Sequence, residues 1–221
     1  MTSMVVFPDI HDQGDDFKKI RHVLADVDVV ILAGDMTKGR VEHLHRVLNF
    51  IEPYNEHILA VCGNMDTERM NMWLANEGIS IHRRSEIFDG LAFLGVGGAL
   101  PYYGDYVFSE EEFEGFLEDT LQGIPKNMPK ILVSHQPPYN TKMDVARNGE
   151  HVGSKSVRAF IEREQPLICF TGHMHSATGI DKIGETLVCN PGPFVKYYAY
   201  AEVENGEVKT LDIRPVESLD I

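Results

Sequence analysis

The chain has 221 residues, with 34 acidic side chains against 20 basic ones and a formal net charge of -14 at pH 7. A composition that is 43% hydrophobic and 24% charged is typical of a folded globular protein, and it excludes disordered and fibrous classes. The negative charge repels polyanions, so we expect neither duplex nucleic acid nor a membrane surface as a partner.

The length suits one domain, and no linker, repeat or low-complexity segment divides the chain, so a single domain over residues 1–221 is predicted. No apolar run approaches the roughly 20 residues that cross a bilayer. The N-terminus lacks the basic region of a secretory signal. Cys62, Cys169 and Cys189 each lie in an apolar stretch, which favours reduced, buried thiols. Together these features predict a cytoplasmic protein.

As far as Thr171, short apolar runs alternate with longer amphipathic segments. The apolar runs predict buried strands at residues 4–7, 29–32, 58–61, 91–95, 131–134 and 167–171. The segments between them predict helices at 14–25, 41–51, 68–76, 109–121 and 154–164. Strands that alternate with helices indicate a layered α/β architecture.

After Thr171 the pattern changes to strands alone, at residues 178–181, 186–189, 195–203 and 207–213. Asn205-Gly206 separates the last two, and this dipeptide favours a tight hairpin turn because it accepts positive φ angles. We therefore expect the first sheet to continue into a second sheet that consists of strands only.

Polar side chains follow five of the predicted strands at the point where each strand ends. In an open α/β sheet, ligands bind at the carboxyl ends of the strands. The residues delivered to this edge, in chain order, are Asp9 and His11, Asp35, Asn64 and Asp66, His135, and His173 and His175.

The types of donor indicate the chemistry. Oxygen and imidazole ligands without thiolates suit divalent Mn, Fe, Zn or Co and disfavour a structural zinc site. These eight residues supply at least seven good donors, which are too many for one tetrahedral ion but suit two ions about 3.5–4 Å apart, which acidify a water molecule for attack on phosphorus. Taken singly, Asp9, Asp35, Asn64 and Asp66 would each more often be a helix cap or a turn former. Their joint occurrence at successive strand ends favours the metal centre.

Five sequence blocks, Asp9-x-His11, Gly34-Asp35, Gly63-Asn64-x-Asp66, His135 and Gly172-His173-x-His175, resemble in order those of the calcineurin-like metallophosphoesterase family. The resemblance extends from Met4 to about Pro193. Asn190-Pro191-Gly192 and Ser134-His135-Gln136-Pro137-Pro138 resemble segments of its small prokaryotic, phosphodiesterase-like branch. The resemblance implies a two-sheet β-sandwich flanked by helices, a four-layer αββα fold, with both metals at one end of the sheets.

The resemblance also implies two divalent ions, which would be Mn, Fe, Zn, Co or Ni. Asp9, His11 and His175 would hold the first ion; Asn64, His135 and His173 would hold the second; Asp35 would bridge them. The implied reaction is hydrolysis of a small phosphoester, in particular a phosphodiester, by a metal-bridging hydroxide. Asn64 would also stabilise charge on the phosphoryl oxygens.

One position departs from the family pattern. Many members carry a histidine, thought to protonate the leaving group, where this chain has Met65, and the residue matching Asp66 normally orients it. General acid catalysis is typically worth about 10²–10⁴-fold. We therefore expect either a preference for good leaving groups or a replacement acid, and His151 in the polar loop 139–153 is the candidate. Asn64, Asp66 and His151 are thus the candidate catalytic residues.

Two alternatives stay open. Met65 also fits a binding or scaffold protein on the same fold, with catalysis weakened or lost. Tyr102, Tyr103 and Tyr139 lie in predicted loops where they could stack on a base or ring, although packing within the loops is the favoured interpretation.

Cyclic nucleotides, linear nucleotides, lipid headgroups and phosphomonoesters are all left open as substrates, because pocket loops and not metal ligands make that choice. The oligomeric state is open as well.

Overall fold

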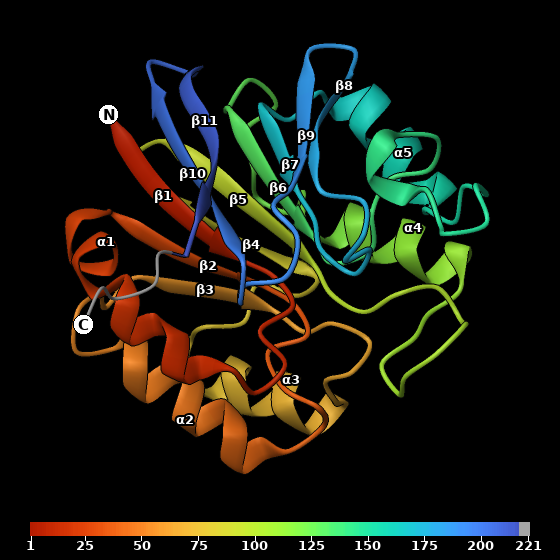
Figure 1. Ribbon diagram of the computed structural model, residues 1–221. Coiled ribbons are helices and arrows are strands. Elements are labelled where there is room, and N and C mark those ends of the chain that lie inside the picture. Colours follow the sequence, from red (N-terminus) through yellow and green to blue (C-terminus); the bar gives the residue numbers. More distant parts are fainter. Residues whose placement is uncertain (217–221) are drawn as a thin grey trace.

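Two β-sheets pack face to face with helices on both outer sides in the computed structural model, which describes residues 1–216 (Figure 1). This arrangement confirms the predicted two-sheet sandwich with its αββα layers. The predicted domain of residues 1–221 includes 217–221, which lie outside the described residues. Within the described part, no helix is long and apolar enough to cross a membrane.

The first sheet has five strands, and its first three strands in chain order are parallel. Its strands, in spatial order, are β11 (Glu207–Pro215), β10 (Tyr197–Glu204), β1 (Thr2–Phe7), β2 (Val29–Ala33) and β3 (Ile58–Val61). The second sheet has six strands, in the order β4 (Arg84–Phe88), β5 (Leu91–Val96), β6 (Lys130–Ser134), β7 (Ile168–Phe170), β9 (Thr186–Asn190) and β8 (Gly179–Ile183).

The helices form the two outer layers. The first sheet packs against the 3₁₀ helix η1 (Gly14–Lys19), α1 (Arg21–Asp26), α2 (Val41–Ile51) and α3 (Glu68–Asn76), with α1 at the left end of the sheet and the others below it in Figure 1. Beside the second sheet lie α4 (Glu110–Asp119), η2 (Lys142–Asp144) and α5 (Lys155–Glu164). Ser154 is the N-cap of α5, and its hydroxyl accepts a hydrogen bond from the Val157 amide.

Three apolar cores correspond to the three interfaces between layers. Along β1, Val5 and Phe7 face the helices while Met4 and Val6 face the other sheet, so both faces of the strand are buried. This is why the strand is a continuous apolar run and does not alternate with polar residues. The third core lies between the second sheet and α4 and α5. Burial of each large apolar side chain contributes roughly 1.5–3 kcal/mol.

The C-terminal strands correct one prediction. β8 and β9 pair beside β7 in the second sheet, whereas β10 and β11 pair beside β1 in the first. The expectation of a second sheet made of strands only is therefore wrong, because each sheet combines parallel strands with antiparallel hairpins, at one edge of the first sheet and at both edges of the second. A hairpin signal such as Asn205-Gly206 specifies the turn but not the sheet that the hairpin joins.

Two further elements differ from the prediction. β4 was not predicted, because this edge strand is mostly exposed and carries no apolar run. The predicted helix 14–25 is divided at Ile20, whose φ of -119° is not helical, into η1 and α1. In contrast, β3, α2 and α3 have the predicted bounds.

Candidate metal centre

The loops after β1 and β2 are joined by backbone hydrogen bonds. The Asp9 amide donates to the Gly34 carbonyl at 3.0 Å, and the His11 amide donates to the Asp35 carbonyl at 2.9 Å. Asp9, His11, Asp35 and also His173 have φ between 48° and 66°, in the left-handed region. Non-glycine residues held there cost of order 1–3 kcal/mol each, and such strain clusters at functional sites.

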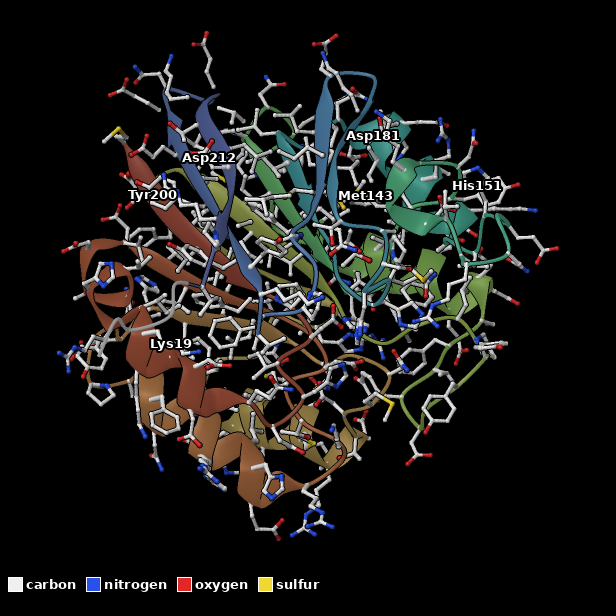
Figure 2. The ribbon with its side chains drawn as sticks, in the orientation of Figure 1. Lys19, Met143, His151, Asp181, Tyr200 and Asp212 are labelled. Atoms are coloured by element: carbon white, nitrogen blue, oxygen red, sulfur yellow. The ribbon has the colours of Figure 1, made fainter. Side chains whose placement is uncertain are left out.

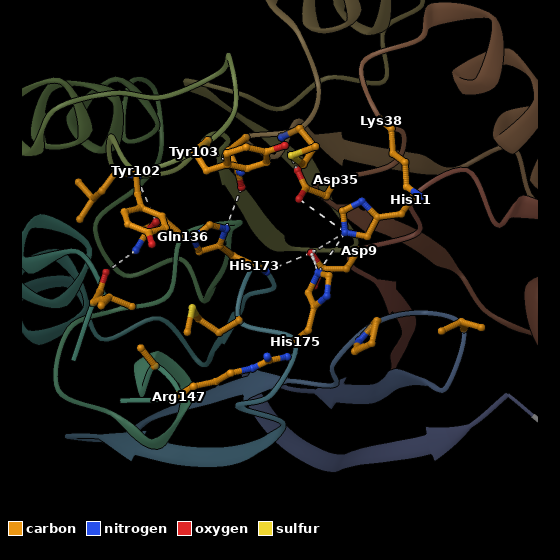
Figure 3. A pocket seen from close by; sticks show the side chains of 18 of the residues that line it. Asp9, His11, Asp35, Lys38, Tyr102, Tyr103, Gln136, Arg147, His173 and His175 are labelled. Atoms are coloured by element: carbon orange, nitrogen blue, oxygen red, sulfur yellow. Dashed lines mark hydrogen bonds and ion pairs between the residues drawn. The ribbon is translucent and has the colours of Figure 1, made fainter. Parts of the chain in front are cut away.

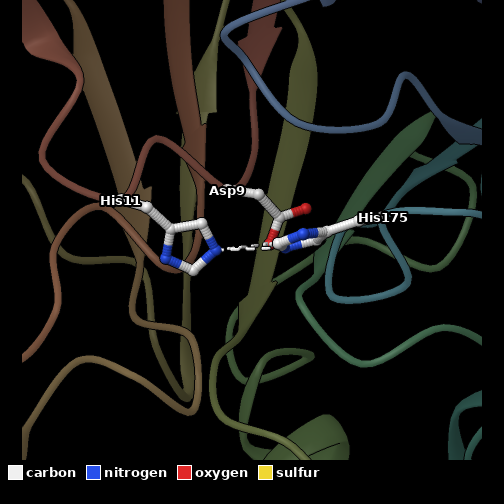
Figure 4. A group of neighbouring side chains, drawn as sticks. All are labelled: Asp9, His11 and His175. Atoms are coloured by element: carbon white, nitrogen blue, oxygen red, sulfur yellow. Dashed lines mark hydrogen bonds and ion pairs between the residues drawn. The ribbon is translucent and has the colours of Figure 1, made fainter.

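Asp9, His11 and His175 form the first group of possible metal ligands (Figure 4). The two Nε2 atoms of His11 and His175 face each other at 3.0 Å. Oδ1 of Asp9 lies 3.3 Å from the His175 Nε2 and 4.0 Å from the His11 Nε2. Three donor atoms from the ends of β1 and β7 thus converge on one small volume.

A second set of donors converges beside the first. Oδ1 of Asn64 lies 2.8 Å from the His173 Nδ1 and 3.2 Å from the His135 Nε2. His135 Nδ1 lies 2.9 Å from the Ala33 carbonyl, to which it donates, so Nε2 is the ring nitrogen that faces the site. Asp9, Asp35 and His135 also form a group that could hold an ion.

Asp35 lies between the two sets. Its Oδ2 is 3.8 Å from the His11 Nε2, and its Oδ1 is 3.5 Å from the His135 Nε2. The Met65 amide donates to Oδ1 at 2.8 Å and orients the carboxylate. A Cβ at Gly63 would lie 2.1 Å from that same oxygen, so only glycine fits at this point of the loop after β3.

Two buried atoms of the first group have no hydrogen-bond partner among the described residues, Oδ2 of Asp9 and Nδ1 of His11. A buried carboxylate is costly unless it is paired or coordinates a metal. The residues therefore fit a divalent cation, since the donors are carboxylate, carboxamide and imidazole atoms that point at common centres.

The ionisation of these groups depends on their mutual charges. Burial favours the neutral form of His135, but the charge and hydrogen bond of Asp35 outweigh it and raise the pKa of His135 to about 9. Burial likewise opposes ionisation of Asp35, yet His135 lowers the pKa of Asp35 overall. Burial lowers the pKa of His173 to about 4, so this imidazole is neutral at pH 7, as a metal ligand must be.

Asp66 is fully buried and does not line the site. It accepts hydrogen bonds from the amides of Gly63 at 2.9 Å, Thr37 at 3.0 Å and Met36 at 3.2 Å, and thereby ties the loop after β2 to the loop after β3. Burial and the charge of Asp35 raise the pKa of Asp66 to about 7. These contacts support a positioning role for Asp66 through Asp35, not contact with a substrate.

His151 is not brought to the site. It lies on the outer loop before α5 (Figure 2), where its Nδ1 is 2.7 Å from Oδ1 of the buried Asp144. Its ring lies edge-on to Tyr139. Its neighbours Glu150 and Val152 line the cleft described next, but His151 does not. The prediction that His151 supplies a proton to the leaving group therefore gains no support from its position.

A cleft of about 1000 Å³ opens over the ligand groups (Figure 3). Lys38 lies on one side of it beside His11, and Arg147 lies beneath His175. Neither cation has an ion pair among the described residues. Neither was predicted from the sequence, because a single Lys or Arg in a loop carries no pattern that assigns it to a site.

Two side-chain amides, those of Asn64 and Gln136, hold the loops that line the cleft beside the candidate metal ligands. Asn64 Nδ2 donates to the Tyr103 carbonyl at 2.9 Å. Gln136 accepts from the Leu100 amide at 3.1 Å and donates to the Val152 carbonyl at 2.9 Å, which joins the loops that carry these two residues.

Comparisons with known proteins show the family and the fold. A family model described as calcineurin-like phosphoesterase matches residues 2–177. An uncharacterized protein of Methanocaldococcus jannaschii is 36% identical over 186 residues, covering 80% of this chain and 83% of that protein. A solved structure from Thermus thermophilus has a TM-score of 0.73 at 17% identity, covering 98% of this chain and 99% of that one. A dimetal phosphatase from Danio rerio has a TM-score of 0.62 at 12% identity, with 97% and 95% covered. The family match and the archaeal relative show that this chain belongs to the calcineurin-like phosphoesterase family.

Proposed function

We propose that the protein is a phosphodiesterase that uses two divalent metal ions, Mn, Fe, Zn, Co or Ni, to hydrolyse a small phosphoester. The observation that carries the proposal is the orientation of Asp35. One of its oxygens faces His11 of the first ligand group, and the other faces His135 of the second. A carboxylate between two sets of donors is the arrangement that a pair of bridged ions requires.

The ligand assignment follows from these contacts. Asp9, His11 and His175 would hold one ion, Asn64, His135 and His173 the other, and Asp35 both. When bound, such a pair of ions supplies an acidified water molecule and neutralises charge on the phosphoryl oxygens.

Residues of the chain orient two of the candidate ligands and attract the substrate. Ala33 fixes the tautomer of His135, and Tyr103 fixes the amide of Asn64 so that its oxygen turns toward the two histidines. Lys38 and Arg147 are the cations of the cleft, and we expect them to attract the anionic phosphoester into an otherwise acidic protein.

The extent of the cleft favours a diester over a monoester. The cleft extends to both sides of the ligand groups, toward Lys38 on one side and toward Tyr102 on the other (Figure 3), so two ester substituents have room. Met65 also lines the cleft and cannot donate a proton, which favours a good leaving group in a monoester and a diester alike.

The test is turnover of bis-(4-nitrophenyl) phosphate and of 4-nitrophenyl phosphate by protein reconstituted with each metal in turn. We expect at least a tenfold higher kcat/KM for the diester. Equal or higher kcat/KM for the monoester would refute the diester preference but leave the phosphoesterase intact.

The alternative is a binding or scaffold protein on the same fold, which Met65 favours. Absence of turnover with every metal would support it. We also propose that the protein acts in the cytoplasm. Its substrate would be small, because the net charge of -14 disfavours binding to duplex nucleic acid or a membrane.

A further inference from the structure

Two tyrosines on the cleft wall are unusually exposed. Tyr102 is 97% exposed and Tyr103 is 68% exposed, and both line the cleft on the side away from Lys38 (Figure 3). Among the described residues, neither side chain takes part in a hydrogen bond, an ion pair or a ring contact. Two adjacent aromatic rings are therefore presented to the cleft without a partner within the chain.

The tyrosine rings do not hold their loop in place. The backbone does so, through the Tyr103 carbonyl on the Asn64 side chain and through the amides of Asp105 and Tyr106, which donate to the Asn64 carbonyl at 3.0 and 3.3 Å. The buried ring of Tyr106 then packs on Phe108. The loop would keep its place without either exposed ring.

Tyr139 shows the contrasting case. Its ring lies against His151, and the Lys155 Nζ lies 5.5 Å from the ring centroid. Tyr139 thus has the loop-packing role that the sequence favoured for all three tyrosines, whereas Tyr102 and Tyr103 do not.

Asn64 holds the backbone of the loop that carries these rings beside the ligand groups. The Tyr103 carbonyl contacts the Asn64 amide, and the oxygen of the same amide lies 2.8 Å from the His173 Nδ1. A substituent on a phosphoryl group held at His173 would therefore lie one side chain away from the backbone of the loop that carries both tyrosines. Bases stack on aromatic side chains with a gain of about 1–3 kcal/mol per base.

We propose that Tyr102 and Tyr103 form a stacking subsite for a planar ring on the ester substituent, so that the substrate is a phosphoester that carries an aromatic or heteroaromatic ring. This inference rests on the proposed phosphoesterase function and specifies its substrate class. A nucleoside and a simple aryl group share the relevant chemistry, and the experiment separates them.

The experiment compares three diesters with the same nitrophenol leaving group, in which the second substituent is thymidine, phenyl or methyl. The variants are Tyr102→Ala and the double variant Tyr102→Ala/Tyr103→Ala, with the corresponding double Phe variant to retain the rings. Tyr54→Ala is the matched control, because Tyr54 is 43% exposed and lies in a separate surface hollow.

For the double Ala variant, we expect KM for the thymidine ester to rise roughly tenfold, the loss of one stacked base. KM for the methyl ester should change less than twofold, and the Phe and Tyr54 variants should behave as the wild type. A similar rise in KM for the phenyl ester would show that the subsite accepts any aromatic ring. An unchanged KM for the phenyl ester would restrict the subsite to the nucleoside. Equal losses on the thymidine and methyl esters, or no loss on either, would overturn the proposal.

Binding of thymidine 5′-monophosphate, measured by calorimetry on the metal-loaded protein, separates this inference from the proposed function. If no ester is hydrolysed but the nucleotide binds, and binding weakens roughly tenfold in the double Ala variant, the subsite stands and the phosphoesterase fails. If esters are hydrolysed and nucleotide binding is the same in the wild type and the double Ala variant, the stacking subsite fails alone.

Discussion

The side-chain amide of Asn64 donates a hydrogen bond of 2.9 Å to the backbone carbonyl of Tyr103. Because the nitrogen is engaged in this way, the oxygen of the same amide must point in the opposite direction, toward His135 and His173. The loop after β5 therefore determines the orientation of a candidate metal ligand that lies after β3. Loss of such supporting contacts typically costs 10–100-fold in metal affinity.

Gly104 holds this loop against Asn64, and its replacement should weaken metal binding. A Cβ at Gly104 would lie 2.2 Å from the Asn64 carbonyl oxygen, and φ is +96°. We expect Gly104→Ala to lower the affinity of the second ligand set at least tenfold and to spare the first set, as measured by calorimetric titration with Mn²⁺.

Gly123→Ala is the matched control for Gly104→Ala. Gly123 has a φ of +78° but nothing within 4 Å of the added Cβ, so it shares the backbone strain without the clash. If both variants bound Mn²⁺ like the wild type, the loop would not determine the position of Asn64.

His151→Ala should retain activity. His151 is paired with the buried Asp144 outside the cleft, and Asp144 keeps three backbone amide donors without it, so the removal of His151 takes no proton donor from the cleft. We expect kcat on a nitrophenyl diester and on an alkyl diester to stay within about twofold of the wild type. General acid catalysis supplies about 10²-fold or more. A loss of kcat of that size on the alkyl diester alone would show that His151 protonates the leaving group, as the sequence suggested.

Gln136 joins two walls of the cleft, and its replacement should affect substrate binding more than metal binding. Gln136→Leu leaves the Leu100 amide and the Val152 carbonyl without their side-chain partner, which should lower the free energy of unfolding by about 2 kcal/mol. KM should rise while Mn²⁺ stoichiometry is unchanged. Gln122→Leu, at an exposed position, is the control, and urea unfolding with steady-state kinetics provides both readouts. Unaltered stability and KM would show that the two hydrogen bonds contribute nothing.

His82 should make the free energy of unfolding depend on pH. Burial, followed by the charges of Arg83 and Arg84, lowers the pKa of His82 to about 4, and the Gly97 amide donates to its Nδ1 at 2.9 Å. The folded pKa is below the unfolded value of 6.5, so the unfolded state binds the proton first as the pH falls from 6.5 to 4. The stability contributed by neutral His82 is complete above pH 6.5, and about 2 kcal/mol of it is lost at pH 5.

His82→Asn preserves an acceptor for the Gly97 amide but does not titrate. In metal-free protein, the difference in unfolding free energy between pH 7.5 and pH 5 should therefore be about 2 kcal/mol smaller in this variant than in the wild type. Equal differences would mean that His82 is protonated in the folded protein at pH 5.

The parts predicted from sequence are those with a local signature. Strands such as β3 are short apolar runs because both faces are buried, and the candidate ligands follow them because parallel strands end at one edge. The structure brings Asp9, His11 and His175 together as the resemblance implies. It also places Asp35 between the two ligand sets.

The parts not predicted depend on long-range contacts. The sequence around Tyr200 predicts a strand but cannot specify that it pairs with Val5 of β1 and not with the second sheet. Likewise, Tyr102 and Tyr139 are both loop aromatics, and only the structure shows that one is exposed while the other packs on His151. For His151 itself, the sequence shows a polar loop but not the direction of the side chain.

The most direct test of the proposed centre is Asp35→Asn, read by metal content and turnover together. After dialysis against Mn²⁺, we expect two ions per chain in the wild type and hydrolysis of bis-(4-nitrophenyl) phosphate. In Asp35→Asn we expect at most one ion and a loss of kcat of at least 10³-fold, while Asp212→Asn on the distant strand β11 behaves as the wild type. Two ions and full activity in Asp35→Asn would contradict the bridging role that we propose for Asp35.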